Sequence, residues 1–157
     1  MGTTAVIVLM IESKRYIANL GDSKAVLSQR GRVSFVTRDH KASDPFEQKR
    51  ITEMGGQVLN GRISDKLSVS RALGDSNLSP YVSAVPDIFE QPISRYDEFM
   101  ILASDGIWDV LTPDDAVNII VSKQKKSVSF VAMSSPPCSP SPSHNSLGHF
   151  FLELFGS

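Results

Sequence analysis

The sequence is nearly free of cysteine, since Cys138 is the only one among 157 residues. A single thiol excludes an internal disulfide framework and a zinc site built from several cysteines. Because nothing in this cysteine usage calls for an oxidising compartment, we expect the protein to reside in the cytoplasm or the nucleus.

Long hydrophobic runs and an excess of one charge are also lacking. The longest early apolar run, residues 5–11, falls far short of the roughly 18 residues that a membrane-spanning helix needs. Sixteen Lys and Arg residues against seventeen Asp and Glu residues give a formal net charge of -1. Such a balance provides no broad basic surface for nucleic acid. We therefore expect neither a membrane nor a nucleic-acid partner, in a chain long enough for one domain with a real core.

Short apolar, β-branched segments separated by turn residues occupy the first forty positions. They predict strands at residues 3–11, 15–20, 24–29 and 32–37, with Gly21-Asp22-Ser23 separating the second from the third. Connections this short favour antiparallel pairing, so we expect a meander. A further apolar run at residues 99–103 predicts a fully buried strand.

Two helices are predicted from capping signals. Asp44 followed by Pro45 is typical of a helix start, and Gly55-Gly56 of its end. Thr112 is typical of the cap of a second helix at residues 113–122. Between them, residues 57–92 are predicted to be an irregular surface excursion, a feature that is often functional.

The composition changes after residue 122. Lysines lead into a stretch dense in serine and proline that cannot bury enough apolar surface to become ordered. We therefore predict a domain at residues 1–122 and a disordered Ser/Pro-rich divergent tail at residues 123–157.

Two carboxylates are candidates for holding a metal ion. Asp105 lies in Ser104-Asp105-Gly106, directly after the predicted buried strand, and Asp22 lies between two predicted strands. A carboxylate at the end of a rigid strand suits a hard cation such as Mg²⁺ or Mn²⁺. Taken alone, each residue is better explained by ordinary turn or cap chemistry, and the sequence cannot show whether the sheet brings the two carboxylates together.

Other catalytic arrangements are not found. The sequence shows no local signature of a Ser, His and Asp triad, no Gly-rich phosphate loop, and no calcium loop around Asp105. His40 is interpreted as a structural residue. No residue is assigned a direct catalytic role, so a hydrolase here would need metal-activated water.

Seven short motifs follow one another over roughly residues 2–121. They are Gly2-Thr3-Thr4-Ala5, Ala18-Asn19-Leu20-Gly21-Asp22-Ser23-Lys24-Ala25-Val26-Leu27, Asp39-His40-Lys41, Arg50-Ile51 with Gly55-Gly56, Leu67-Ser68-Val69-Ser70-Arg71-Ala72-Leu73-Gly74-Asp75, Val85-Pro86-Asp87, and Leu102-Ala103-Ser104-Asp105-Gly106-Ile107-Trp108-Asp109-Val110-Leu111. In this order the motifs resemble the type 2C family of metal-dependent protein serine/threonine phosphatases.

The resemblance implies an α+β fold, namely part of an α-β-β-α sandwich of antiparallel sheets flanked by helices. It implies a Mg²⁺ or Mn²⁺ cluster whose bound hydroxide attacks the phosphorus of phosphoserine or phosphothreonine in protein substrates. Asp105 matches a core metal ligand, Asp22 matches a ligand of an additional, weaker ion, and residues 55–75 match a flap beside the cleft. Members of the family are often monomeric.

Parts of the family pattern are absent from this sequence. They are an upstream Asp-Gly-His-Gly-Gly motif, an upstream phosphate-binding arginine and a late Asp-Asn motif. Three hypotheses follow: a phosphatase of the family that is impaired or inactive, a catalytically dead truncated isoform acting as a binding or regulatory module, or an incomplete gene product without a stable fold.

Overall fold

The computed structural model describes residues 1–132 and 150–156, which form two antiparallel sheets and a few helices. The first sheet has the strand order β10 (Phe150–Gly156), β1 (Gly2–Ile11), β2 (Lys14–Leu20), β8 (Asp87–Pro92), with β7 (Leu73–Gly74) paired to β1. The second has the order β4 (Arg32–Val36), β3 (Lys24–Gln29), β9 (Asp97–Ala103). The expected α+β class is confirmed.

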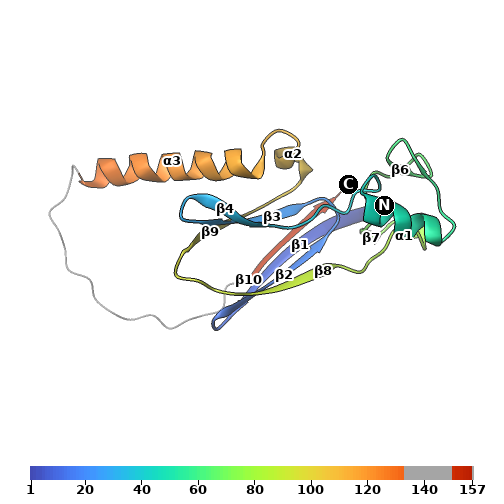
Figure 1. Ribbon diagram of the computed structural model, residues 1–157, viewed down its shortest axis with the longest axis horizontal. Coiled ribbons are helices and arrows are strands. Elements are labelled where there is room, and N and C mark those ends of the chain that lie inside the picture. The colour runs from blue at the N-terminus through green and yellow to red at the C-terminus, as the bar shows by residue number, and fades with distance from the viewer. Residues whose placement is uncertain (133–149, 157) are drawn as a thin grey trace.

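The helices and a small hairpin surround this pair of sheets. They are α1 (Pro45–Glu53), α2 (Asp105–Trp108), α3 (Pro113–Ala132), the 3₁₀ turn η1 (Ser76–Leu78), and the hairpin of β5 (Val58–Leu59) with β6 (Arg62–Ile63). Figure 1 shows α3 lying along the second sheet, where it packs on β4, and α1 beside the small hairpin at one end. No helix among the described residues is long and apolar enough to cross a membrane.

The two sheets enclose one apolar core. Val6, Val8 and Ile17 of the first sheet are buried against Ala25 of the second. Phe35 and Phe89 then meet edge to face, with ring centroids 5.1 Å apart, a geometry that aromatic pairs favour. The sheets are therefore the two layers of a single sandwich.

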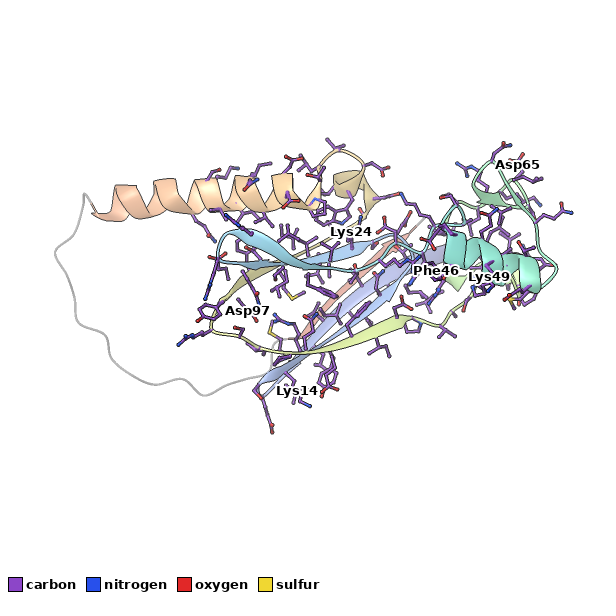
Figure 2. All side chains as sticks on the ribbon, in the orientation of Figure 1. Lys14, Lys24, Phe46, Lys49, Asp65 and Asp97 are labelled. Atoms are coloured by element: carbon purple, nitrogen blue, oxygen red, sulfur yellow. The ribbon has the colours of Figure 1, made fainter. Side chains whose placement is uncertain are left out.

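The two ends of the sandwich along its long axis carry different residues. Figure 2 shows Phe46 and Lys49 of α1 together with Asp65 at one end, and Lys14 and Asp97 toward the other. Helix α1 begins as the sequence predicts, because the Asp44 carboxylate accepts hydrogen bonds from the backbone N–H of Phe46 at 3.0 Å and of Glu47 at 3.4 Å. The end that carries α1 is the one at which the candidate site lies.

The predicted meander is wrong at one connection. Strand β2 pairs with β1 and β8, whereas β3 pairs with β4 and β9, so the chain crosses from one sheet to the other at residues 21–23. A short connection is compatible with either outcome, and the choice depends on partners distant in the sequence. This crossing places Asp22 at the rim of the sandwich.

Two further strand predictions need correction. Residues 57–92 are not wholly irregular, because β8 occupies residues 87–92 and completes the pairing of β2. Strand β9 begins at Asp97, and its residues are half-buried rather than fully buried, with Glu98 exposed. Among the described residues β9 is an edge strand, which explains its partial burial.

The segment after residue 122 has regular structure in two described places. Helix α3 continues to Ala132, and residues 150–156 form β10, which pairs antiparallel with β1. Residues 123–132 contain no proline, so nothing in them prevents the helix from continuing. The predicted disorder of the tail stays a prediction, and residues 133–149 lie outside the described residues. The domain division at residue 122 stays a prediction.

Candidate functional site

The pairing of β3 with β9 brings the two predicted metal ligands to the same end of the sandwich. Lys24, the first residue of β3, lies opposite Ala103, the last residue of β9. Asp22 precedes the first of these by two residues and Asp105 follows the second by two residues. Antiparallel register thus produces the convergence that the sequence leaves undecided.

The electrostatics of Asp22 reflect this convergence. Burial raises the pKa of the Asp22 carboxyl, and the nearby carboxylates of Asp105 and Asp39 raise it further. The Lys41 ammonium lowers the pKa of Asp22 but does not cancel these effects. Asp22 is half-buried and Asp105 is exposed. Two carboxylates that repel one another in this way form a location where a cation is favoured.

Cationic side chains surround the carboxylates. Lys24 Nζ lies 3.1 Å from Asp39 Oδ1 and also 5.8 Å from the centre of the Trp108 ring. Lys41 Nζ lies 4.0 Å from Asp109 Oδ1. These lysines therefore pair with neighbouring acids, and Lys41 also acts on Asp22 by lowering its pKa.

A polar hollow of about 370 Å³ adjoins this cluster. Its lining is Lys24, Thr37, Arg38, Asp39, Lys41, Ser43 and Asp44. The cations inside it already have acidic partners, because Arg38 donates to both carboxylate oxygens of Asp44 at 2.6 and 2.7 Å. The hollow is therefore polar but close to neutral.

The turn that carries Asp22 is fixed by close contacts. Gly21 has a φ of 100°, and a Cβ at this position would lie 2.3 Å from Cγ2 of Thr4, so only glycine fits. The hydroxyls of Thr4 and Ser23 are 2.8 Å apart. The backbone N–H of Gly21 donates to Nδ1 of His40 at 3.1 Å, and the backbone N–H of His40 donates to the Gly21 carbonyl at 2.9 Å.

A buried polar network continues behind His40. The imidazole is only 1% exposed, and its Nε2 lies 3.1 Å from Oδ2 of Asp87. The other oxygen of Asp87 accepts from Nη1 of Arg71 at 2.8 Å. Burial alone would raise the pKa of Asp87, but the adjacent His40 imidazole and the charge of Arg71 hold it below its usual value.

Glu47 of α1 is the centre of this network. Its Oε1 accepts from Nε and Nη2 of Arg71 at 3.0 and 2.5 Å, and its Oε2 accepts from Arg50 and from the Ser70 hydroxyl. Burial acts to raise the pKa of Glu47, but the hydrogen bonds from Arg71 and Ser70 outweigh it and lower the pKa to about 2. Glu47 is therefore a buried carboxylate that is ionised and fully partnered.

The residues present fit a divalent cation only in part. Carboxylate oxygens are the right donors for Mg²⁺ or Mn²⁺, but each ion needs about six oxygen ligands. Within residues 1–132 and 150–156, no three His, Cys, Asp or Glu side chains are grouped so as to hold a metal ion. The structure brings Asp22 and Asp105 together, and their role as ligands stays a prediction.

Several residues that shape this site are not among the functional residues predicted from the sequence. Asp39 and Lys41 affect the charge of Asp22, and His40 holds the turn next to it. All three belong to the motif Asp39-His40-Lys41, which is the signal that could have identified them. The ion pair of Glu47 with Arg71 joins α1 to a loop 24 residues later in the sequence. No short sequence pattern predicts this pair.

The pKa of Asp22 leads to a stability prediction. Because this pKa is raised in the folded state, the ionised carboxylate opposes folding at neutral pH, and stability falls as the pH rises through the folded pKa. Asp22→Asn should therefore raise the melting temperature at pH 7 without added metal. The difference in melting temperature between Asp22→Asn and the wild type should disappear below pH 3.8, the ordinary pKa value of an aspartate carboxyl. Thermal unfolding at several pH values measures this.

A matched control for Asp22→Asn is Asp65→Asn, at an exposed position of the small hairpin segment. It should change the melting temperature little, since surface substitutions are usually within about 0.5 kcal/mol. A melting temperature that Asp22→Asn lowers at pH 7 would contradict the prediction.

Comparisons with known proteins agree with this architecture. The pattern of the protein phosphatase 2C family matches residues 1–134. The chain is 40% identical over 131 residues to Protein phosphatase 1B of Mus musculus, covering 78% of this chain and 34% of that protein. It is 41% identical over 123 residues to Protein phosphatase 2C 3 of Arabidopsis thaliana, covering 76% and 28%.

Solved structures show the same similarity. The serine-threonine phosphatase 2C from Toxoplasma gondii aligns with a TM-score of 0.70 at 27% identity, covering 84% of this chain and 51% of that one. A C. elegans sex-determining protein aligns with a TM-score of 0.62 at 36% identity, covering 66% and 26%. The fold is thus that of a type 2C phosphatase.

The chain belongs to the protein phosphatase 2C family. It spans between a quarter and about a third of the length of the two curated relatives named above.

Proposed function

We propose that this chain forms part of a protein serine/threonine phosphatase domain that hydrolyses phosphoserine and phosphothreonine in protein substrates. The observation that supports this proposal is the position of Asp22 and Asp105, whose charges interact at one end of a sandwich of the phosphatase 2C family. The proposal includes the expected location in the cytoplasm or nucleus.

In this proposal Asp105 and Asp22 hold Mg²⁺ or Mn²⁺. A bound ion would supply a hydroxide near neutral pH and offset the negative charge that develops on the phosphoryl oxygens. The protein's own contribution is to present the carboxylates. Asp22 is kept in place by the tightly packed turn at residues 21–23, and Asp105 starts the short helix α2 after β9. The repulsion between them is relieved when a cation lies nearby.

A second candidate is a catalytically dead member of the family that binds phosphoproteins or partners without turning them over. It is favoured by the limited ligand set, since the described residues offer no group of three metal-binding side chains. The two candidates share the fold and the acidic site and differ in turnover.

Binding of Mn²⁺ by the chain tests the proposed metal site. Calorimetric titration of the 157-residue protein should show a site that Asp105→Asn weakens by about 10-fold or more, equivalent to about 1.4 kcal/mol, because a charged ligand is lost. Asp114→Asn, an exposed residue in the first turn of α3, is the matched control and should leave the affinity unchanged. Equal Mn²⁺ affinity in the wild type and Asp105→Asn would contradict the assignment.

A further inference from the structure

We propose that His40 is a positioning residue for the Asp22 carboxylate. Its buried imidazole ties the turn at residues 21–23 to Asp87 on β8, and through Asp87 to the ion pair of Arg71 with Glu47. This inference deepens the proposed function, and it rests on that function only in so far as Asp22 binds a metal ion.

The hydrogen bond that the His40 imidazole accepts defines its tautomer. Because Nδ1 accepts the backbone N–H of Gly21, this nitrogen carries no proton. The proton of the neutral ring therefore lies on Nε2, which faces the Asp87 carboxylate 3.1 Å away. With 1% of the side chain exposed, water does not compete for either nitrogen. The ring is thus hydrogen-bonded at Nδ1, while Nε2 faces the Asp87 carboxylate in an electrostatic contact that lacks hydrogen-bond geometry.

The turn needs such support because it belongs to neither sheet. Residues 21–23 connect β2 to β3 outside the pairing of both strands. The carboxylates of Asp105 and Asp39 both raise the pKa of Asp22, so they repel its ionised form. The two hydrogen bonds between Gly21 and His40 hold the turn directly beside Asp22.

The network also joins the turn to the segment that follows the small hairpin. The backbone N–H of Ser70 donates to the carbonyl of His40 at 2.8 Å, while the Ser70 hydroxyl donates to Glu47 at 2.8 Å. His40 therefore lies between the Asp22 turn and residues 70–71, with polar contacts to both. Its role is to transmit a fixed position, and it has no contact with the reacting atoms.

Two substitutions separate the two nitrogen atoms of His40. In His40→Asn the side-chain oxygen can occupy the place of Nδ1 and accept from Gly21, but the group does not reach Asp87. In His40→Gln the amide can reach Asp87, but it does not accept from Gly21. His40→Asn is thus the variant expected to rescue the Asp22 turn, and His40→Gln the variant expected to release it.

The first test is made by nuclear magnetic resonance on the metal-free 157-residue protein. A scalar coupling between the amide nitrogen of Gly21 and Nδ1 of His40 should be observed across the hydrogen bond. Amide exchange at residues 21–23 should be faster by about 10-fold in His40→Gln than in His40→Asn, as the loss of about 1.4 kcal/mol of local stability implies. Exchange at Ile17 and Val26 in the core strands serves as the internal reference.

The second test is Mn²⁺ affinity. His40→Gln should weaken binding by about 10- to 100-fold, the range typical of residues that orient metal ligands, and His40→Asn should restore most of it. If the wild-type chain binds no Mn²⁺, the proposed metal site fails while the exchange experiment still decides the role of His40. Absence of the coupling in the wild type, or equal exchange at residues 21–23 in both variants, would overturn the inference. If His40→Gln does not fold, the coupling in the wild type decides the matter.

Discussion

Replacing Glu47 with alanine is expected to destabilise the folded chain by about 3–5 kcal/mol, the usual cost of removing one partner from a buried ion pair. The Glu47 side chain is 5% exposed and that of Arg71 is 17% exposed. Removing the carboxylate leaves the Arg71 guanidinium with Asp87 as its remaining acidic partner, and it deprives Arg50 and Ser70 of an acceptor. Urea unfolding at pH 7 measures the change.

Lys49→Ala on the same helix is the matched control. Lys49 forms an exposed pair with Glu53 at 3.8 Å, and pairs of this kind contribute about 0.3–0.5 kcal/mol. A destabilisation by Glu47→Ala no larger than that by Lys49→Ala would show that the network adds nothing to stability.

The hydrogen-bond network around Glu47 also makes the stability of the folded chain depend on pH. The pKa of Glu47 falls from 4.5 to about 2 on folding, so its stabilising contribution is present above pH 4.5 and is lost as the pH falls toward 2. At about 1.4 kcal/mol per pKa unit, this contribution is about 3.5 kcal/mol at most. Glu47→Gln should therefore differ from the wild type at pH 6 and converge with it near pH 2, as followed by urea unfolding across this range.

A protein consisting of these 157 residues alone is expected to hydrolyse a phosphothreonine peptide several orders of magnitude more slowly than a complete phosphatase domain of the family. The reason is that two carboxylates cannot fix a pair of metal ions that share a hydroxide, and the described residues offer no third ligand grouped with them. Phosphate release in the presence of Mn²⁺ measures this rate.

Asp105→Asn is the control for that experiment. If the slow residual rate belongs to the proposed site, this substitution abolishes it. Turnover comparable to that of a complete domain, and lost in Asp105→Asn, would show instead that other groups replace the missing ligands. Binding of the phosphopeptide with no turnover at all would favour the second candidate, a dead binding module.

Local patterns predicted the elements that depend on neighbouring residues. The first four strands and the start of α1 at Asp44 and Pro45 follow from alternation and capping, which act over a few positions. The crossing at Gly21, by contrast, depends on which strands pair across the whole chain. Strand β8 was missed for the same reason, since its pairing partner β2 lies some 70 residues earlier in the sequence.

In the candidate site, too, features set by neighbouring residues could be predicted, whereas those set by long-range pairing could not. Asp105 and Asp22 could be identified by their positions at strand ends, and the resemblance reinforced both. Their convergence could not be predicted from the sequence, because it follows from the register of β3 with β9. His40 was interpreted as structural on the ground that it is a lone histidine, and its burial between Gly21 and Asp87 became visible only with the tertiary structure.

The position of Trp108 gives this protein an optical property. It is the only tryptophan of the chain, and its indole N–H donates to the Ala103 carbonyl at 2.8 Å, which holds the ring against the end of β9. The ring therefore lies three residues from Asp105 and 5.8 Å from the ammonium of Lys24. Light absorbed by tryptophan is emitted from this one end of the sandwich. Fluorescence excited selectively in tryptophan, apart from the three tyrosines, is therefore a local signal from the surroundings of the acidic pair.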